Sequence, residues 1–271
     1  VRVTGVQTCA LPICHDHRDA GGFWIARGAR WLAPEQVYYA GYETSAHNTI
    51  LVDGKGQAIS TPGSPGSDGL DRDGPPYDAE IVATGGSSDY QWVETDLTRA
   101  YGSVGGVERL RRFVLYIRPD VFLLVDDLQA SSPLSVSSVF HAESSISSDG
   151  DWQILKTAGA DQLGVLPLPV DGTVPTATTT QAAGGMPELH LTGSEGTGTV
   201  GATLLVAGTS DNWESRPTAD AARLSPRSLE VTVRYPDGSK VTVTIDLGAS
   251  PATLSCTRYD AAGATLDGFL F

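Results

Sequence analysis

The 271-residue chain has few cysteines, few positive charges and no long hydrophobic run. Its three cysteines, Cys9, Cys14 and Cys256, form neither a disulfide framework nor the paired spacing of a zinc ribbon. Lys and Arg number 18 against 32 Asp and Glu, and the net charge of −14 argues against a nucleic-acid partner. No stretch of 18 consecutive apolar residues occurs, so we expect no insertion into a membrane.

Apolar residues with the spacing of amphipathic helices are also scarce. Short β-rich runs separated by turn residues recur instead, which indicates an all-β fold. In residues 228–247 the apolar residues alternate on both sides of Asp237-Gly238, a strong hairpin signal. The run "VFLLV" at 121–125 is typical of a strand buried on both faces. The sequence predicts one multi-stranded antiparallel β-sandwich, with the Gly- and Pro-rich segment 171–187 as a surface loop.

The first residues of the chain differ in character from the rest. A signal peptide is not predicted, because Gln7, Thr8 and Cys9 interrupt a short apolar run. The stretch "VTGVQTCALPI" at 3–13 resembles the in-frame translation of a sequencing adapter. We therefore expect residues 1–14 not to be native and residues 15–271 to be an N-terminally truncated domain, the alternative being a genuine extended arm.

Three histidines lie in two polar motifs near this start. His15 and His17 alternate in "HDHRDAGGF", and His47 follows in "SAHNTILVDG". In a strand, residues i and i+2 face the same way about 7 Å apart, which suits one ligand beside one substrate-facing group. A hairpin over 21–33 would return Glu35 toward His17, so that these two residues and His47 could meet as a zinc set. Polar residues at strand ends explain the same pattern, and both interpretations stay open.

The two motifs together resemble the C-terminal domain of the heparinase II/III-like polysaccharide lyases, whose architecture alginate and oligoalginate lyases share. The family pattern is H-x-H-x-D-x-x-x-F, then a strand ending in an acidic residue, then S/T-x-A-H-N-T/S followed by apolar residues and D-G. The matching residues are His15, His17, Asp19, Phe23, Glu35, Thr44, Ala46, His47, Asn48, Thr49, Ile50, Leu51, Asp53 and Gly54. The stretches "RRFVLYIRPDVFLLVDDLQA" and "SVFHAE" also match, so the resemblance covers nearly the whole chain after residue 14.

The resemblance implies a β-sandwich that accompanies an N-terminal α/α-toroid, which is missing here. It also implies that His15 faces the cleft and assists catalysis, and that His17, Glu35 and His47 bind a structural Zn²⁺. One departure concerns the acid, because relatives usually carry Asp followed closely by Gly where this chain has Glu35 in "PEQV". Asp19 fits either a carboxylate partner of a ligating imidazole or a turn-former before "AGG".

The resemblance further implies cleavage of a uronic-acid-containing polysaccharide, heparin/heparan-like or alginate-like, by β-elimination. This reaction needs a base for the proton α to the uronate carboxyl, a donor to the carboxylate and an acid for the leaving oxygen. Most of these groups belong to the toroid, so we expect the fragment alone to be inactive. Tyr38, Tyr39 and Tyr42 could contribute at the cleft edge, although core or rim positions are more typical.

An anionic polysaccharide or oligosaccharide is therefore the expected partner, and its polymeric nature implies a periplasmic or secreted protein. The alternative is a non-catalytic carbohydrate-binding or structural β-sandwich module. A zinc hydrolase is disfavoured because no H-E-x-x-H motif occurs.

Other polar residues in the predicted strands have simpler interpretations. His141 is expected to face the opposite sheet, and His190 to face solvent between two leucines. Arg109 and Arg111 share one face of a strand and Arg112 takes the other. For Arg109 and Arg111 the sequence favours a solvated strand face over contact with a uronate.

Overall fold

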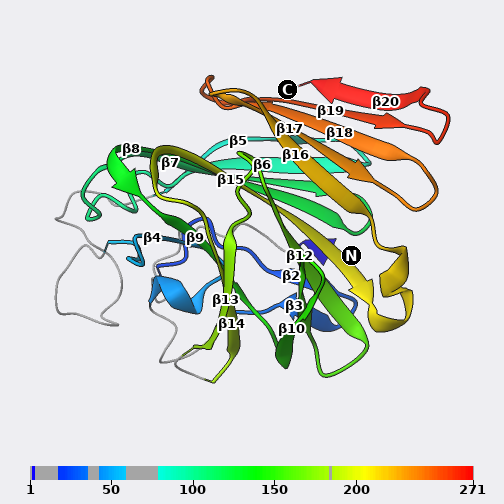
Figure 1. The fold of residues 1–271 in the computed structure, drawn as a ribbon, viewed down its shortest axis with the longest axis horizontal. Coiled ribbons are helices and arrows are strands. Elements are labelled where there is room, and N and C mark those ends of the chain that lie inside the picture. The colour runs from blue at the N-terminus through cyan, green and yellow to red at the C-terminus, as the bar shows by residue number, and fades with distance from the viewer. Residues whose placement is uncertain (1, 4–17, 36–42, 59–78, 183–184, 271) are drawn as a thin grey trace.

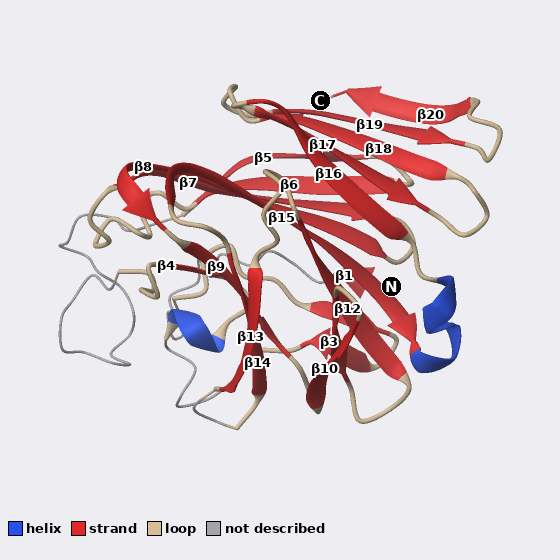
Figure 2. Cartoon of the chain, in the orientation of Figure 1, coloured by secondary structure: helices blue, strands red, loops and turns tan. Residues whose placement is uncertain are grey.

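The strands pair into antiparallel sheets that stack in layers around a central eight-stranded sheet (Figure 1). The computed structural model describes residues 2–3, 18–35, 43–58, 79–182 and 185–270, and nearly all of their regular structure is β (Figure 2). The central sheet has the order β10 (Ser145–Asp149), β11 (Trp152–Lys156), β12 (Asp161–Leu168), β15 (Gly196–Thr209), β8 (Val121–Leu134), β7 (Val107–Ile117), β6 (Tyr90–Asp96) and β5 (Glu80–Gly86). No helix in this described part is long and apolar enough to cross a membrane.

Three smaller sheets cover the two faces of the central one. One face carries a five-stranded meander of β16 (Thr218–Ser225), β17 (Ser228–Arg234), β18 (Lys240–Asp246), β19 (Thr253–Tyr259) and β20 (Thr265–Leu270). The other face carries a four-stranded sheet of β13 (Thr176–Gln181), β14 (Pro187–Thr192), β9 (Val136–His141) and β4 (Ile50–Val52). Beside it lies a three-stranded sheet of β1 (Arg2–Val3), β2 (Ile25–Arg27) and β3 (Arg30–Ala33). Two short 3₁₀ helices are η1 (Thr44–Ala46) and η2 (Ser210–Ser215).

The central strand β8 explains the continuous apolar run seen in the sequence. Val121, Leu123 and Val125 belong to the core shared with the five-stranded sheet. Phe122 and Leu124 belong to the core on the opposite face, with β9, β14 and the β2–β3 hairpin. Successive side chains of a strand point to opposite faces, so a strand covered on both sides must be apolar throughout. The prediction for this strand is confirmed.

The predicted hairpin over 228–247 is also confirmed, as β17 and β18. Its six alternating apolar side chains all enter the core between the layers: Leu229, Val231, Val233, Val241, Val243 and Ile245. Gly238 closes the turn with φ +86°, a conformation that side chains with a Cβ rarely adopt.

The prediction of a surface loop over 171–187 is wrong in its middle, where β13 forms. All six residues of β13 are exposed, and their backbone pairs with β14 from Thr176–Thr192 to Gln181–Pro187. Because no apolar residue alternates along this edge strand, the hydrophobic pattern carried no signal for it.

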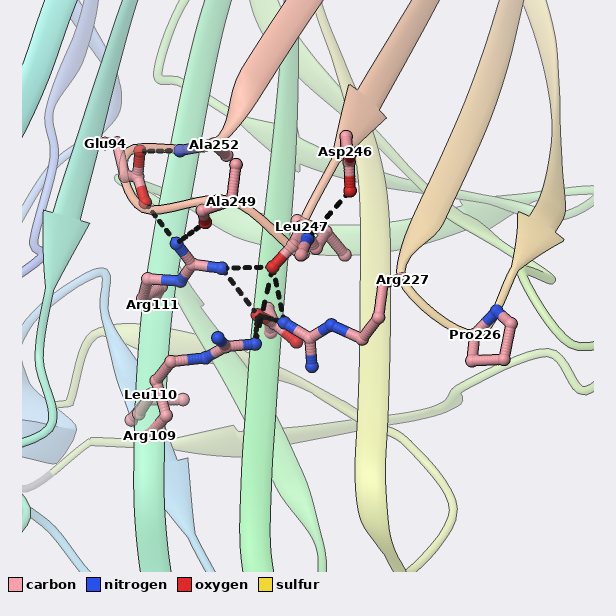
Figure 3. A network of polar contacts seen from close by, with 12 residues as sticks. Glu94, Arg109, Leu110, Arg111, Pro226, Arg227, Asp246, Leu247, Ala249 and Ala252 are labelled. Atoms are coloured by element: carbon pink, nitrogen blue, oxygen red, sulfur yellow. Dashed lines mark hydrogen bonds and ion pairs between the residues drawn. The ribbon is translucent and has the colours of Figure 1, made fainter.

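The prediction of a solvated strand face for Arg109 and Arg111 is wrong for Arg111, which is buried, as is Arg112 on the other face of the strand. Arg111 donates to Glu94 Oε1 at 2.7 Å and to the Leu247 carbonyl at 2.6 Å, which joins the central sheet to the five-stranded sheet (Figure 3). Asp127 accepts from Arg109 at 2.9 Å and from Arg111 at 3.3 Å, so these two side chains do share a face. Burial raises the pKa of Asp127, and the adjacent arginines oppose that shift.

Candidate functional site

A tight turn leads the chain from the first histidine motif into the β2–β3 hairpin. Gly22 N–H donates to the Asp19 carbonyl at 2.7 Å, and Gly21 has φ +69°. The turn-forming interpretation of Asp19 is therefore confirmed for its backbone. A Cβ on Gly22 would lie 2.6 Å from the Asp19 carbonyl oxygen and 3.2 Å from Glu35 Oε1, so the glycine leaves room for the Glu35 carboxylate.

Glu35 and His47 meet in the interior, next to this turn. His47 Nδ1 lies 3.1 Å from Glu35 Oε2, and both side chains are almost fully buried. Glu35 follows β3, and His47 follows η1 just before β4. The predicted hairpin over 21–33 forms, with β2 and β3 joined at Gly28, and it returns Glu35 to this point. A buried carboxylate is costly unless a cation or hydrogen-bond donors compensate it.

Asn48 is the hydrogen-bonding hub of the site and is completely buried. Its amide nitrogen donates to the carbonyls of Phe23 at 3.0 Å, Ala33 at 3.3 Å and Pro34 at 2.8 Å. Its amide oxygen accepts from the His141 backbone N–H at 2.8 Å and lies 3.2 Å from His141 Nδ1. This one side chain therefore ties the hairpin stem and β9 together directly beside His47.

His141 completes the hub from β9, where it is fully buried. Because Asn48 Oδ1 can only accept, the short contact assigns the ring proton of neutral His141 to Nδ1. His141 Nε2 then faces Glu188 Oε2 at 3.9 Å without a hydrogen-bond partner among the described residues. Burial lowers the pKa of His141, and the carboxylates of Glu188 and Glu35 oppose that shift.

Arg112 supports the site from the central sheet. Its guanidinium makes a two-point ion pair with Asp126, with N···O distances of 2.7 Å and 2.9 Å. It also donates to the Gly21 carbonyl at 3.1 Å and to the Asn48 carbonyl at 3.5 Å. A planar five-donor group suits such convergent acceptors. Arg112 is thus part of the framework of the site rather than a solvated cation.

The predicted site residues divide into two groups. Glu35 and His47 are in contact, whereas His15, His17, Tyr38, Tyr39 and Tyr42 lie outside the described residues. Within the described ranges, no three His, Cys, Asp or Glu side chains already converge as a metal site. The role of Glu35 and His47 as ligands therefore stays a prediction.

Sequence reasoning missed the parts played by Asn48 and His141. The sequence places Asn48 within the A-H-N motif and His141 in a strand, facing the other sheet, and predicts no contact between them. His190, which the sequence predicts to face solvent, is partly exposed and also contacts Glu188. The only signal for the Asn48–His141 pair was that both stand in stretches matching one family pattern.

A sequence model described as "Heparinase II/III-like, C-terminal" matches residues 14–241. The chain belongs to this heparinase II/III-like family. The match includes the hairpin, Glu35, His47, Asn48 and His141. No curated protein sequence matches the chain significantly.

Solved structures of heparinase-like proteins share the fold. A heparan sulfate lyase, HepC from Pedobacter heparinus, superposes with a TM-score of 0.63 at 12% identity, over 85% of this chain and 37% of that one. A structure described as a heparinase III, the BT4657 gene product, gives 0.62 at 14% identity, over 85% and 37%. A further heparinase III gives 0.59 at 14%, over 86% and 36%. The heparinase II/III-like chain thus spans little more than a third of these proteins.

Proposed function

We propose that this domain is the C-terminal part of a polysaccharide lyase that cleaves uronic-acid-containing chains by β-elimination. The observation that carries the proposal is the buried Glu35–His47 pair, fixed by Asn48, within a chain of the heparinase II/III-like family. Heparan-like and alginate-like polymers both carry the uronate that the reaction needs. The likeness to heparan sulfate lyases favours the first substrate.

We further propose that Glu35, His47 and His17 hold a Zn²⁺ ion. Glu35 Oε2 and His47 Nδ1, 3.1 Å apart, could both reach one ion at ordinary zinc distances of about 2.0–2.2 Å. A bound cation would also compensate the buried Glu35 carboxylate, which is otherwise costly. Zinc would act there as a structural tie between the turn after His17, the end of β3 and the start of β4.

The residues of this chain would then position and assist rather than carry out the whole reaction. Asn48 holds both stems of the hairpin, and Arg112 holds the turn at Gly21. His15, two residues before the proposed ligand His17, would face the cleft and help to move a proton during elimination. The remaining acid–base groups would belong to an α/α-toroid in the whole protein, which would act in the periplasm or outside the cell.

The metal proposal is tested by the zinc content of the purified chain. We expect about one zinc per chain for the wild type and a large loss in His47→Ala and in His17→Ala. His190→Ala is the matched control, because His190 lies in β14 and outside the proposed ligand set. A wild-type chain that stays metal-free after incubation with zinc would end the metal proposal.

The lyase proposal is tested separately in the full-length protein. Incubation with heparan sulfate and with alginate should release unsaturated uronate products, detected by their ultraviolet absorbance, from one of the two polymers. Binding of a polymer without any unsaturated product would instead favour the second candidate, a non-catalytic carbohydrate-binding module. The chain by itself is expected to release no product.

A further inference from the structure

The β2–β3 hairpin has one face in the core and one face turned away from it. The inner residues belong to the core beneath the central sheet: Phe23, Ile25, Leu32 and Ala33. Ala26 pairs with Trp31 across the hairpin, and Trp24 precedes Ala26 by two residues. Because side chains alternate along a strand, these three residues share the outer face. The outer face of the hairpin therefore carries the side chains of two tryptophans, with the small side chain of an alanine between them.

The two tryptophans are exposed to solvent to different extents. Trp31 is 49% exposed, and it is the one aromatic residue among the exposed large hydrophobics of the described chain. Trp24 is partly exposed. In the described structure neither ring takes part in a hydrogen bond, a ring contact or a cation–π contact. Large exposed aromatic groups gathered on one face are typical of binding surfaces, because leaving them in water is unfavourable.

The hairpin that carries these rings is held at both ends. Asn48 binds the carbonyls of Phe23 and Pro34 at its stem. Near the turn, Arg27 pairs with Asp161 at 3.4 Å and Arg30 pairs with Glu143 at 3.7 Å. A platform that is already fixed loses little conformational entropy when a ligand binds. The two arginines near the turn are therefore already paired with carboxylates of neighbouring segments.

The outer face adjoins the candidate metal centre along the chain. Trp31 stands four residues before Glu35, so their Cα atoms are at most about 14 Å apart. That span is within reach of an oligosaccharide longer than a disaccharide. A saccharide bound at the surface beside this buried centre could therefore extend over the hairpin.

We propose that Trp31 and Trp24 form a subsite that stacks a sugar ring of a uronate-containing oligosaccharide, outside the reacting unit. The inference rests on the proposed function. Flat aromatic faces match the C–H face of a pyranose ring, and the free indole N–H groups can donate to its hydroxyls. The chain is acidic, with a net charge of −14, and Arg27 and Arg30 are already paired. Stacking therefore supplies affinity for an anionic chain where charge does not.

The test is a titration of the chain with a uronate disaccharide and with the matching hexasaccharide, followed by calorimetry. Trp31→Ala should weaken hexasaccharide binding about tenfold, equivalent to about 1.4 kcal/mol, and leave disaccharide binding unchanged. Trp31→Phe keeps a flat ring and should retain most of the affinity. Leu224→Ala is the control, because Leu224 is similarly exposed at 56% but lies in β16 on the opposite layer. Because the lost contact is stacking rather than an ion pair, the hexasaccharide affinity of Trp31→Ala should change with salt concentration as the wild-type affinity does.

The other outcomes separate the failure of the subsite from the failure of the lyase proposal. Equal hexasaccharide affinity in Trp31→Ala and wild type would remove the subsite, and the lyase proposal would stand on product release. If Trp31→Ala weakens binding of the hexasaccharide but not of the disaccharide, and the full-length protein releases no unsaturated product, the subsite stands and the lyase proposal fails. Trp31→Ala that lowers the melting temperature of the full-length protein but not its affinity would show that the outer face contacts protein instead. A wild-type chain that binds neither saccharide would overturn the subsite as well.

Discussion

Replacement of Asn48 by alanine tests whether one buried amide holds the site together. Asn48 makes three short hydrogen bonds, at 2.8 Å to Pro34, 2.8 Å from the His141 N–H and 3.0 Å to Phe23, and two longer ones. Each buried group left without a partner costs about 1–3 kcal/mol, and water entering the cavity offsets part of that cost. Taking the low end of this range for each of the three short bonds, we expect Asn48→Ala to lower the free energy of unfolding by about 3–5 kcal/mol. This is a large share of a typical stability of about 5–15 kcal/mol.

The assay is equilibrium unfolding in urea, followed by tryptophan fluorescence. Asn212→Ala is the matched control, because Asn212 is exposed in η2 and should change stability by less than about 0.5 kcal/mol. A loss below about 1 kcal/mol for Asn48→Ala would refute the reasoning. A double-mutant cycle with His141→Ala adds a second condition, since groups that share one hydrogen bond are not additive. Strict additivity would show that the two side chains act independently.

The same hub predicts an effect on the metal centre. Asn48 fixes the stem that carries Glu35 and stands beside His47, so its loss should loosen both proposed ligands. Supporting residues around metal ligands typically change metal affinity by about 10–100-fold. We expect a loss in this range for Asn48→Ala under conditions where the variant stays folded, and none for Asn212→Ala. Competition with a chelating zinc indicator measures it.

Three further predictions concern the fold around the site. Gly164→Ala should cost about 1–3 kcal/mol in thermal unfolding because its Cβ would overlap the Trp213 ring, whereas Gly201→Ala, with open space around it, should cost far less. Burial lowers the pKa of the His141 imidazole below its usual value of 6.5. As the pH falls, the unfolded chain therefore binds a proton at His141 before the folded chain does. Stability should therefore fall as the pH drops below about 6.5, and His141→Gln should flatten that dependence in urea titrations at several pH values. Arg111→Met should cost about 3–5 kcal/mol in denaturant unfolding by leaving the buried Glu94 carboxylate without its cation, and a loss under about 1 kcal/mol would contradict that account.

Sequence reasoning worked where one local pattern has one physical explanation. Alternation around Asp237-Gly238 predicts a hairpin, and a continuous run such as 121–125 predicts a strand covered on both faces; the structure confirms both. The two histidine motifs also indicated the family, which the match over residues 14–241 shows. The turn before "AGG" follows from glycines that adopt a positive φ.

Sequence reasoning failed where the outcome depends on a distant partner. The sequence predicts a solvated face for Arg111 because charged residues are usually exposed, but Arg111 and Arg112 are both buried. Their carboxylates stand 14 to 17 residues away along the chain, in strands that become neighbours only in the sheet. β13 escaped notice because an exposed edge strand needs only backbone pairing, which leaves no apolar pattern.

The sequence by itself determined the all-β class, the main hairpins, the family and the meeting of His47 with Glu35. Those features follow from side-chain alternation, turn chemistry and motif spacing, all of which are local. Only the tertiary structure decided that Asn48 binds groups 14, 25 and 93 residues away, and that the hairpin leaves Trp31 on an open face. Hydrogen-bond partners and exposure depend on which strands pack together. The residue pattern of any single segment does not contain that information.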